Sequence, residues 1–203
     1  MPFMVYSVWE IFRRYVIMEK TKKLVIAALF AALCCIATMI HIPSGPTLGY
    51  VHLGDALVLF SGIILGPVYG SLAAGIGSMM ADVINGYPLY VPGTFVIKAL
   101  CALVCGLLFH SLKKKAQSKG SLYPVLILSS VVAELVMVLG YFLYEIGLFM
   151  ITGSENPNLA TAVATSLTGI PYNLAQGLVA VVLCVVLVPI LTKINDLRDA
   201  ILG

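Results

Sequence analysis

Residues 53–88 read LGDALVLFSGIILGPVYGSLAAGIGSMMADVINGYP, two apolar segments joined by Gly66 and Pro67. The segments cover residues 53–65 and 68–84, and neither contains a Lys or an Arg. Apolar runs with so little charge are typical of helices that lie in a membrane. Because Gly and Pro together favour tight turns, the pair at 66 and 67 predicts that the two segments run antiparallel, side by side.

The rest of the chain repeats this pattern. Of the 203 residues, 61% are hydrophobic and 10% are charged, whereas a soluble domain carries roughly 25% charged residues. Further membrane spans are predicted at residues 24–40, 94–112, 122–150 and 160–191. The predicted fold class is therefore an all-α integral membrane protein with six transmembrane helices, because a bilayer forces backbone groups to pair within each segment.

Positive charges set the predicted orientation. All but one of the 12 Lys and Arg residues precede the first span, follow the fourth or follow the sixth, and the exception is Lys98. Short loops that retain Lys and Arg stay on the cytoplasmic side. Both termini of this multi-pass cell-membrane protein are therefore predicted to be cytoplasmic. The cluster at residues 113–115 is interpreted as a contact with the anionic lipid bilayer and not with nucleic acid.

One membrane domain, residues 18–195, is predicted between two short ends. Residues 1–17 show no signal-peptide cleavage site and are predicted to be an N-terminal extension or an interfacial segment. Residues 196–203 are predicted to be a cytoplasmic tail. The five cysteines lie in apolar runs and are predicted to be buried core residues. No metal site is predicted, and Asp55 is interpreted as a helix cap.

Polar side chains gather toward the predicted outer side of the membrane. Ionisable groups in hydrocarbon cost about 2.5–3.5 kcal/mol each on insertion scales, so those that persist usually line a cavity or pair. Helical spacing places Ser78 and Asp82 on one face, and Asn173 and Gln176 on another. The predicted substrate-binding residues are Asp82, Asn85, Tyr87, Lys98, Glu134, Tyr141, Asn173 and Gln176.

Two other interpretations stay open. In one, Lys98 pairs with Asp82 or Glu134 merely to neutralise a buried charge. In the other, Asp82, Glu134 or Glu145 carries protons in a stand-alone secondary transporter of a small polar solute. An enzyme is not predicted, and no cofactor is expected, because the chain has neither a His-Glu-x-x-His motif nor a G-x-x-x-x-G-K-[ST] loop.

Several short motifs resemble one known family, the substrate-binding S components of energy-coupling factor (ECF) vitamin transporters. The resemblance covers about residues 18–195 and begins with a lysine-rich start and an Ala-rich first span. It further rests on residues 49–55 (GYVHLGD), the Gly66-Pro67 turn, and residues 82–86 (DVING), 92–98 (PGTFVIK) and 170–176 (IPYNLAQ). Within the family, the chain is most similar to the hydroxymethylpyrimidine and pyridoxine type, which is grouped with riboflavin-type members.

This resemblance implies a function, a lid and a set of partners. It implies a high-affinity capture subunit for a small heterocyclic vitamin or precursor, with hydroxymethylpyrimidine or pyridoxine favoured over riboflavin. It places a lid in the first outer loop, at His41, Pro43, Gly49, Tyr50 and His52. It also implies two ATP-binding-cassette ATPase subunits, which hydrolyse the ATP, and a membrane coupling subunit. Facing that subunit would be the small residues Ala27, Ala28, Ala31 and Ala32.

Overall fold

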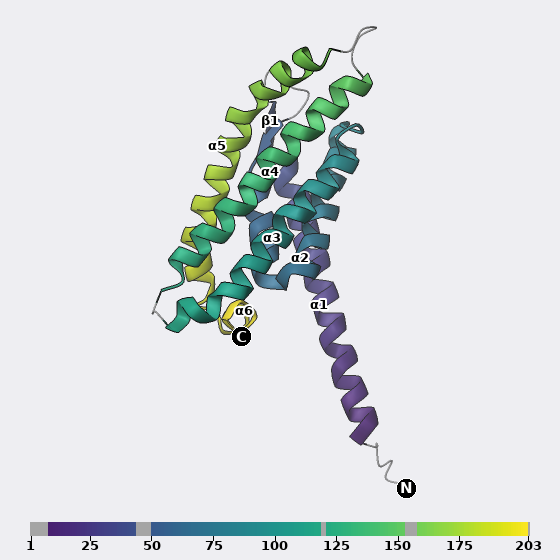
Figure 1. Ribbon diagram of the computed structural model, residues 1–203. Coiled ribbons are helices and arrows are strands. Elements are labelled where there is room, and N and C mark those ends of the chain that lie inside the picture. The colour runs from purple at the N-terminus through teal and green to yellow at the C-terminus, as the bar shows by residue number, and fades with distance from the viewer. Residues whose placement is uncertain (1–7, 44–49, 119–120, 153–157, 203) are drawn as a thin grey trace.

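The computed structural model describes residues 8–43, 50–118, 121–152 and 158–202. Five helices in these ranges are long and apolar enough to cross a membrane. They are α1 (Val8–Met39), α2 (Gly54–Asn85), α3 (Val91–Ser118), α4 (Tyr123–Thr152) and α5 (Leu159–Leu191), followed by the short α6 (Asn195–Leu202). The helices form an elongated bundle in which the start of α1 and all of α6 lie at one end, here called the base (Figure 1).

The predicted second and third spans are the two arms of α2. Gly66 interrupts this helix with φ 79° and ψ 173°, a conformation that glycine adopts at little cost. The Ser61 hydroxyl donates to the Gly70 carbonyl at 3.0 Å, although residues nine apart in a straight helix lie about 13.5 Å apart. The chain therefore folds back at Gly66, and α2 is a helical hairpin with its bend toward the base (Figure 1).

Glycines let the neighbouring helices approach this hairpin closely. A Cβ atom on Gly62 would come within 2.3 Å of the Ala102 carbonyl oxygen, so α3 lies directly against the first arm. A Cβ atom on Gly77 would come within 2.2 Å of the Ala31 carbonyl oxygen, so α1 lies against the second arm. Small residues at helix contacts are typical of membrane proteins, where packing drives association.

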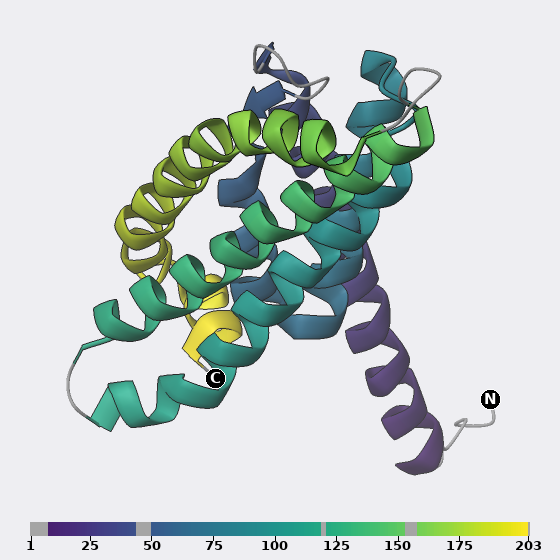
Figure 2. The same cartoon turned by 45° about the horizontal axis from the view of Figure 1, so that its top comes forward.

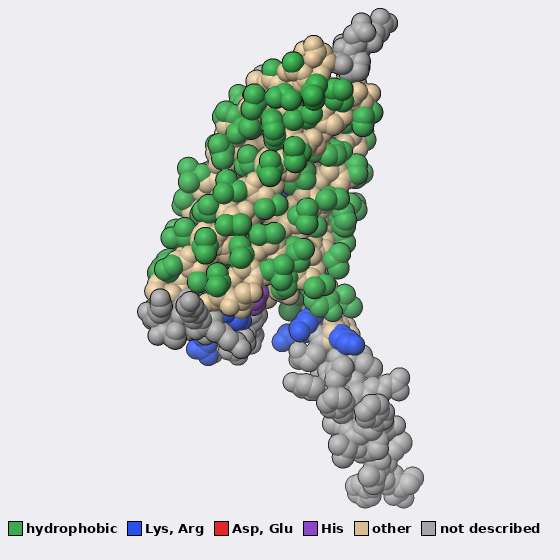
Figure 3. Space-filling model, viewed as in Figure 1, with side chains coloured by type: hydrophobic (Ala, Val, Ile, Leu, Met, Phe, Trp, Pro, Cys, Tyr) green, Lys and Arg blue, Asp and Glu red, His purple; other side chains and the backbone are tan. Residues whose placement is uncertain are grey.

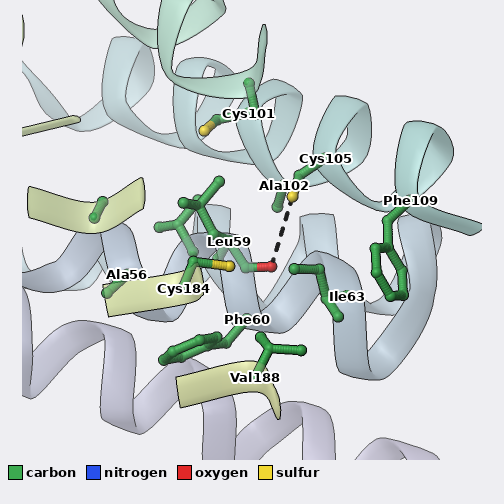
Figure 4. Packing of buried hydrophobic residues seen from close by; sticks show 14 of the residues in the cluster. Ala56, Leu59, Phe60, Ile63, Cys101, Ala102, Cys105, Phe109, Cys184 and Val188 are labelled. Atoms are coloured by element: carbon green, nitrogen blue, oxygen red, sulfur yellow. Dashed lines mark hydrogen bonds between the residues drawn. The ribbon is translucent and has the colours of Figure 1, made fainter. Parts of the chain in front are cut away.

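An apolar core fills the interior of the bundle (Figure 4). Leu59 and Phe109 are fully buried there, and the Cys105 thiol lies 3.9 Å from the Leu59 carbonyl oxygen. Cys184 and Val188 of α5 close the same core. The prediction for the cysteines is confirmed in large part, because all five are free thiols, four are buried and Cys35 is half-buried.

Two short strands cover the opposite end of the bundle. Strands β1 (His41–Pro43) and β2 (Tyr50–His52) pair antiparallel, with His41 opposite His52. The all-α prediction missed this small sheet, because three-residue strands are too short to show a periodic pattern. Of the predicted lid, Pro43 and Tyr50 lie in the strands, whereas Gly49 lies outside the described residues. The two strands are called the cap below.

The remaining features of the fold are the surface of the bundle, the course of α5 and the position of α6. Hydrophobic side chains cover the face of the bundle seen in Figure 3, and the Lys and Arg side chains visible on this face lie near the base. α5 continues as a helix through Pro171 and Pro189 and follows a curved course (Figure 2). All of α6 except its first residue lies in the predicted C-terminal tail. Ile201 of α6 is fully buried, and its backbone carbonyl accepts a hydrogen bond from Lys113 Nζ at 3.1 Å.

Candidate functional site

Three buried polar side chains from three helices meet below the cap. Lys98 Nζ of α3 donates to Asp55 Oδ1 of α2 at 2.5 Å. Gln176 Nε2 of α5 donates to Asp55 Oδ2, also at 2.5 Å. Lys98 and Asp55 are 0% exposed and Gln176 is 4% exposed. These three residues, called the polar cluster below, thus occupy both carboxylate oxygens of Asp55.

The polar cluster corrects two sequence-based interpretations. Asp55 is not a helix cap, because Leu53 holds the N-cap position of α2 and its side chain makes no capping bond. Lys98 pairs with Asp55, and not with Asp82 or Glu134 as the sequence suggested. Helical spacing shows which residues share a face of one helix, but it does not show which acid on another helix meets a lysine.

The polar cluster is joined to the cap through His52. The His52 backbone N–H donates to Gln176 Oε1 at 2.8 Å, while the Gly54 backbone N–H donates to His52 Nδ1 at 3.0 Å. Nδ1 accepts this bond only when it carries no proton, so the ring is neutral. Burial, and then the positive charge of Lys98, lowers the pKa of His52 to about 3. Gln176 therefore connects the ion pair directly to strand β2.

Aromatic side chains extend the site along α3 and α4. Lys98 Nζ lies 5.0 Å from the centroid of the Tyr141 ring, within range of a cation–π interaction. The Tyr141 hydroxyl is 3.1 Å from Thr94 Oγ1. Immediately before the start of α3, the Tyr90 hydroxyl donates to Glu145 Oε1 at 3.4 Å. Tyr141 thus offers a flat apolar face beside a charged polar edge.

A pocket opens beside the polar cluster, between the end of α1, the start of α2 and α5. Its volume is about 330 Å³, and its walls are Ile40, His41, His52, Leu53, Ala175, Gln176 and Val179. Small-molecule sites are mostly apolar pockets of roughly 300–1,000 Å³ with a few placed polar groups. Here His41, His52 and Gln176 provide the polar groups, so the pocket has the size and the character of a site for a small ligand.

The structure brings only some of the predicted binding residues together. Lys98 and Gln176 belong to the polar cluster, and Tyr141 lies against it. Asn85 and Tyr87 instead contact His41 of the cap, at 3.4 Å between Asn85 Nδ2 and His41 Nδ1 and at 6.2 Å between the rings of His41 and Tyr87.

The other three predicted residues are not members of the polar cluster. Asp82 is buried near the end of α2, where its backbone carbonyl accepts a bond from Tyr87 at 2.9 Å. Asn173 is half-buried on α5 and makes no side-chain hydrogen bond with the described residues. Glu134 is buried on α4. Asp55, which sequence reasoning did not include, is the centre of the cluster. The sequence feature that could have identified Asp55 is a single acidic residue at the start of an apolar run.

The four alanines of α1 divide between two surfaces. The Ala31 backbone faces Gly77 of α2, and Ala27 is half-buried as well. Ala28 and Ala32, four residues apart on one stripe of the helix, are exposed. Part of the small-residue pattern is therefore explained by packing within the chain, and only Ala28 and Ala32 leave a surface open to another molecule.

Together, the apolar helices, the buried polar cluster and the cap define a helical membrane protein with a pocket beside a buried polar cluster at one end. Residues 18–193 match the model of the family described as ECF-type riboflavin transporter, S component. Because the match covers most of the chain, the protein belongs to this family of ECF transporter S components.

A solved structure supports the fold. The S component of a bacterial ECF transporter superimposes with a TM-score of 0.62 at 21% sequence identity, over 86% of this chain and 97% of that chain. Among curated proteins, one from Pyrococcus woesei, described as an uncharacterized protein in a gap 3′ region, is 36% identical over 104 residues. That match covers 51% of this chain and 64% of the other protein, less than two thirds of its length.

Proposed function

We propose that this chain captures a small heterocyclic vitamin at the outer side of the cell membrane, and that the polar cluster provides its specificity. The observation that carries the proposal is the buried contact of Asp55 with Lys98 and Gln176 directly below the cap. The three side chains offer a cation, a carboxylate and an amide, which can satisfy both donors and acceptors of a heterocycle. Tyr141 adds a face on which a flat ring can stack.

The proposed ligand is a flat nitrogen heterocycle, with riboflavin as the first candidate. The family that the chain matches is described as a riboflavin transporter S component. The sequence motifs, in contrast, most resemble family members of the hydroxymethylpyrimidine and pyridoxine type. All three compounds present ring nitrogens or hydroxyl groups to a polar cluster. We therefore place riboflavin first and the two smaller rings second, the reverse of the order that the motifs alone imply.

We further propose six membrane segments, counting both arms of α2, with both termini in the cytoplasm. Two observations support this orientation: the start of α1 and α6 lie at the base, and the visible Lys and Arg side chains lie there too (Figures 1 and 3). Basic residues are retained on the cytoplasmic side. The polar cluster below the cap then lies toward the outside, where a nutrient is met first.

The proposed partners are a membrane coupling subunit and two ATP-binding-cassette ATPases. Ala28 and Ala32 are the exposed small residues of α1, and such residues let another helix approach closely. Ala28→Trp is therefore expected to block vitamin uptake in cells while ligand binding by the purified chain is retained. Uptake at the rate of the unchanged protein would exclude this surface as the contact with the coupling subunit.

Calorimetric titration of the detergent-purified chain tests the proposed function. The ligands are riboflavin, hydroxymethylpyrimidine, pyridoxine, thiamin and pantothenate, added to the chain without partner subunits. A capture subunit is expected to bind one of them with a dissociation constant on the order of nanomolar, about −12 kcal/mol. If folded protein binds none of the five, and proteoliposomes holding this chain alone accumulate a solute with a proton gradient, the alternative of a secondary transporter is correct.

A further inference from the structure

A second buried carboxyl group, which is not hydrogen-bonded to the polar cluster, lies between α4 and α5. Glu134 is 4% exposed. Its Oε1 atom is 4.0 Å from the Cys101 thiol, while Oε2 has no hydrogen-bond partner among the described residues. A buried polar atom without a partner carries a free-energy cost of about 1–3 kcal/mol. Such an atom is rare in folded proteins and calls for an explanation, which a ligand can supply.

The missing side chain of Gly177 leaves room beside this carboxyl group. A Cβ atom on Gly177 of α5 would lie 3.1 Å from both Cβ and Oε2 of Glu134. The space belongs to a groove of about 170 Å³ whose other walls are aliphatic: Val131, Leu135, Val138, Leu174, Leu178 and Val181. Leu135 and Leu178 are 54% and 66% exposed, so the groove opens on the apolar side of the bundle, which faces lipid.

Among the described residues, no Lys, Arg or His forms a salt bridge with Glu134. The Lys98 ammonium group is engaged by Asp55 at 2.5 Å. A complement to the carboxyl group therefore has to enter through the groove, where all other walls are apolar. A molecule that meets this requirement has a basic group that donates a hydrogen bond at one end, and an aliphatic chain attached to it.

We propose that the groove between α4 and α5 is a binding site for a lipophilic amine, which reaches it from the lipid phase and binds Glu134 Oε2 with its amino group. The volume of about 170 Å³ is below the roughly 300 Å³ of ordinary small-molecule sites. The groove therefore holds the amino head and the first carbons, and a longer chain continues through the open mouth into lipid. Glu134 makes no hydrogen bond to the polar cluster, so this proposal does not depend on the proposed function.

The probe for the test is dicyclohexylcarbodiimide, a lipid-soluble reagent for carboxyl groups. The carboxyl oxygen bonds to the carbodiimide carbon and its proton moves to a nitrogen; the acyl group then migrates to nitrogen, so the whole reagent is added and nothing leaves. Peptide mass spectrometry of the full chain in detergent is expected to find the adduct on Glu134. Octylamine at ten times its dissociation constant leaves about one site in eleven free, so labelling slows about tenfold.

Matched reagents and variants complete the test. Octanol at the same concentration is expected to leave labelling unchanged, because it lacks the basic head. Gly177→Ala, which fills the space beside Oε2, is expected to slow labelling and remove the octylamine effect. Gly147→Ala on the same helix as Glu134, where a Cβ meets nothing within 4 Å, is the control and is expected to behave like the unchanged chain. Absent labelling of Glu134, or equal protection by octanol and octylamine, would overturn the proposal.

Discussion

Asp55 and Glu134 are carboxyl groups of similar burial in one membrane bundle, yet their surroundings are opposite. Asp55 has a lysine on one oxygen and an amide on the other. Glu134 has a thiol at 4.0 Å on one oxygen and no partner for the other among the residues that the structure describes. The first group is completed by the chain itself. The second is open to a molecule from outside.

The difference shows that burial alone does not reveal whether a carboxyl group already has its hydrogen-bond partners within the chain. An acid that is paired and hydrogen-bonded becomes costly to disturb, because removing one partner leaves an uncompensated charge. An acid with an open oxygen loses little when it is made neutral. The variants below are ordered by the size of the effect that this comparison predicts.

The largest effect is expected for Lys98→Met. This change leaves the fully buried Asp55 carboxylate without its cation, which lowers the free energy of unfolding by about 3–5 kcal/mol. Chemical unfolding in detergent, followed by circular dichroism, measures the change. Lys193→Met, the same substitution at an exposed lysine near the base, is the control and should cost under about 0.5 kcal/mol. Equal costs for the two variants would show that the ion pair does not stabilise the fold.

The next effect is expected for Gln176→Leu. The leucine leaves two buried atoms without partners, Asp55 Oδ2 and the His52 backbone nitrogen, at a cost of about 2–3 kcal/mol. Asn173→Leu, one turn earlier on α5 and half-buried without a hydrogen bond to the described residues, should cost less than about 1 kcal/mol. The same unfolding measurement applies, and a larger loss for Asn173→Leu would contradict the role given to Gln176.

A third effect concerns pH. The pKa of His52 in the folded chain is lowered to about 3, while in the unfolded chain it is near 6.5, so between these values the unfolded state binds more protons. Stability therefore falls as the pH drops below about 6.5, by about 2 kcal/mol at pH 5. His52→Gln, which keeps an acceptor for Gly54, should flatten this dependence. An unchanged slope between pH 7 and pH 5 would assign the loss to other groups.

The smallest effect is expected for Glu134→Gln. The amide has the shape of the carboxyl group and gives up only an oxygen that has no partner in the described ranges, so the free energy of unfolding should change by less than about 1 kcal/mol. Chemical unfolding of the Glu134→Gln and Lys98→Met forms in the same detergent compares their free energies of unfolding directly. A loss as large as that of Lys98→Met would mean that the chain itself pairs Glu134, and the contrast with Asp55 would fail.

The sequence predicts the bounds of α4 and α5 well, because the length of each apolar run corresponds to the length of its helix. Residues 122–150 and 160–191 were predicted as spans, and α4 (Tyr123–Thr152) and α5 (Leu159–Leu191) match them closely. The Gly66-Pro67 pair likewise marked the position where α2 folds back. Local composition carries these features, so no knowledge of neighbouring helices is needed.

The site could be predicted only in part. Lys98 and Gln176 were identified because a charge or an amide inside an apolar run is conspicuous. Their common partner Asp55 was missed, because the pairing depends on the rotation and depth of three helices that lie far apart in the sequence. The same reason explains why Ala31 packs against Gly77 while Ala28, on the next stripe of α1, stays exposed.

The central claim is that the polar cluster binds the vitamin, and calorimetry on three forms of the chain tests it most directly. The unchanged chain, Lys98→Met and Lys193→Met are titrated in detergent with riboflavin, or with whichever of the five candidates binds. Loss of a charged contact in the site is expected to weaken binding of the Lys98→Met form about 100-fold, close to 3 kcal/mol, while the Lys193→Met form binds as the unchanged chain does. Equal affinity of all three folded forms would contradict the account and place the binding site elsewhere in the bundle.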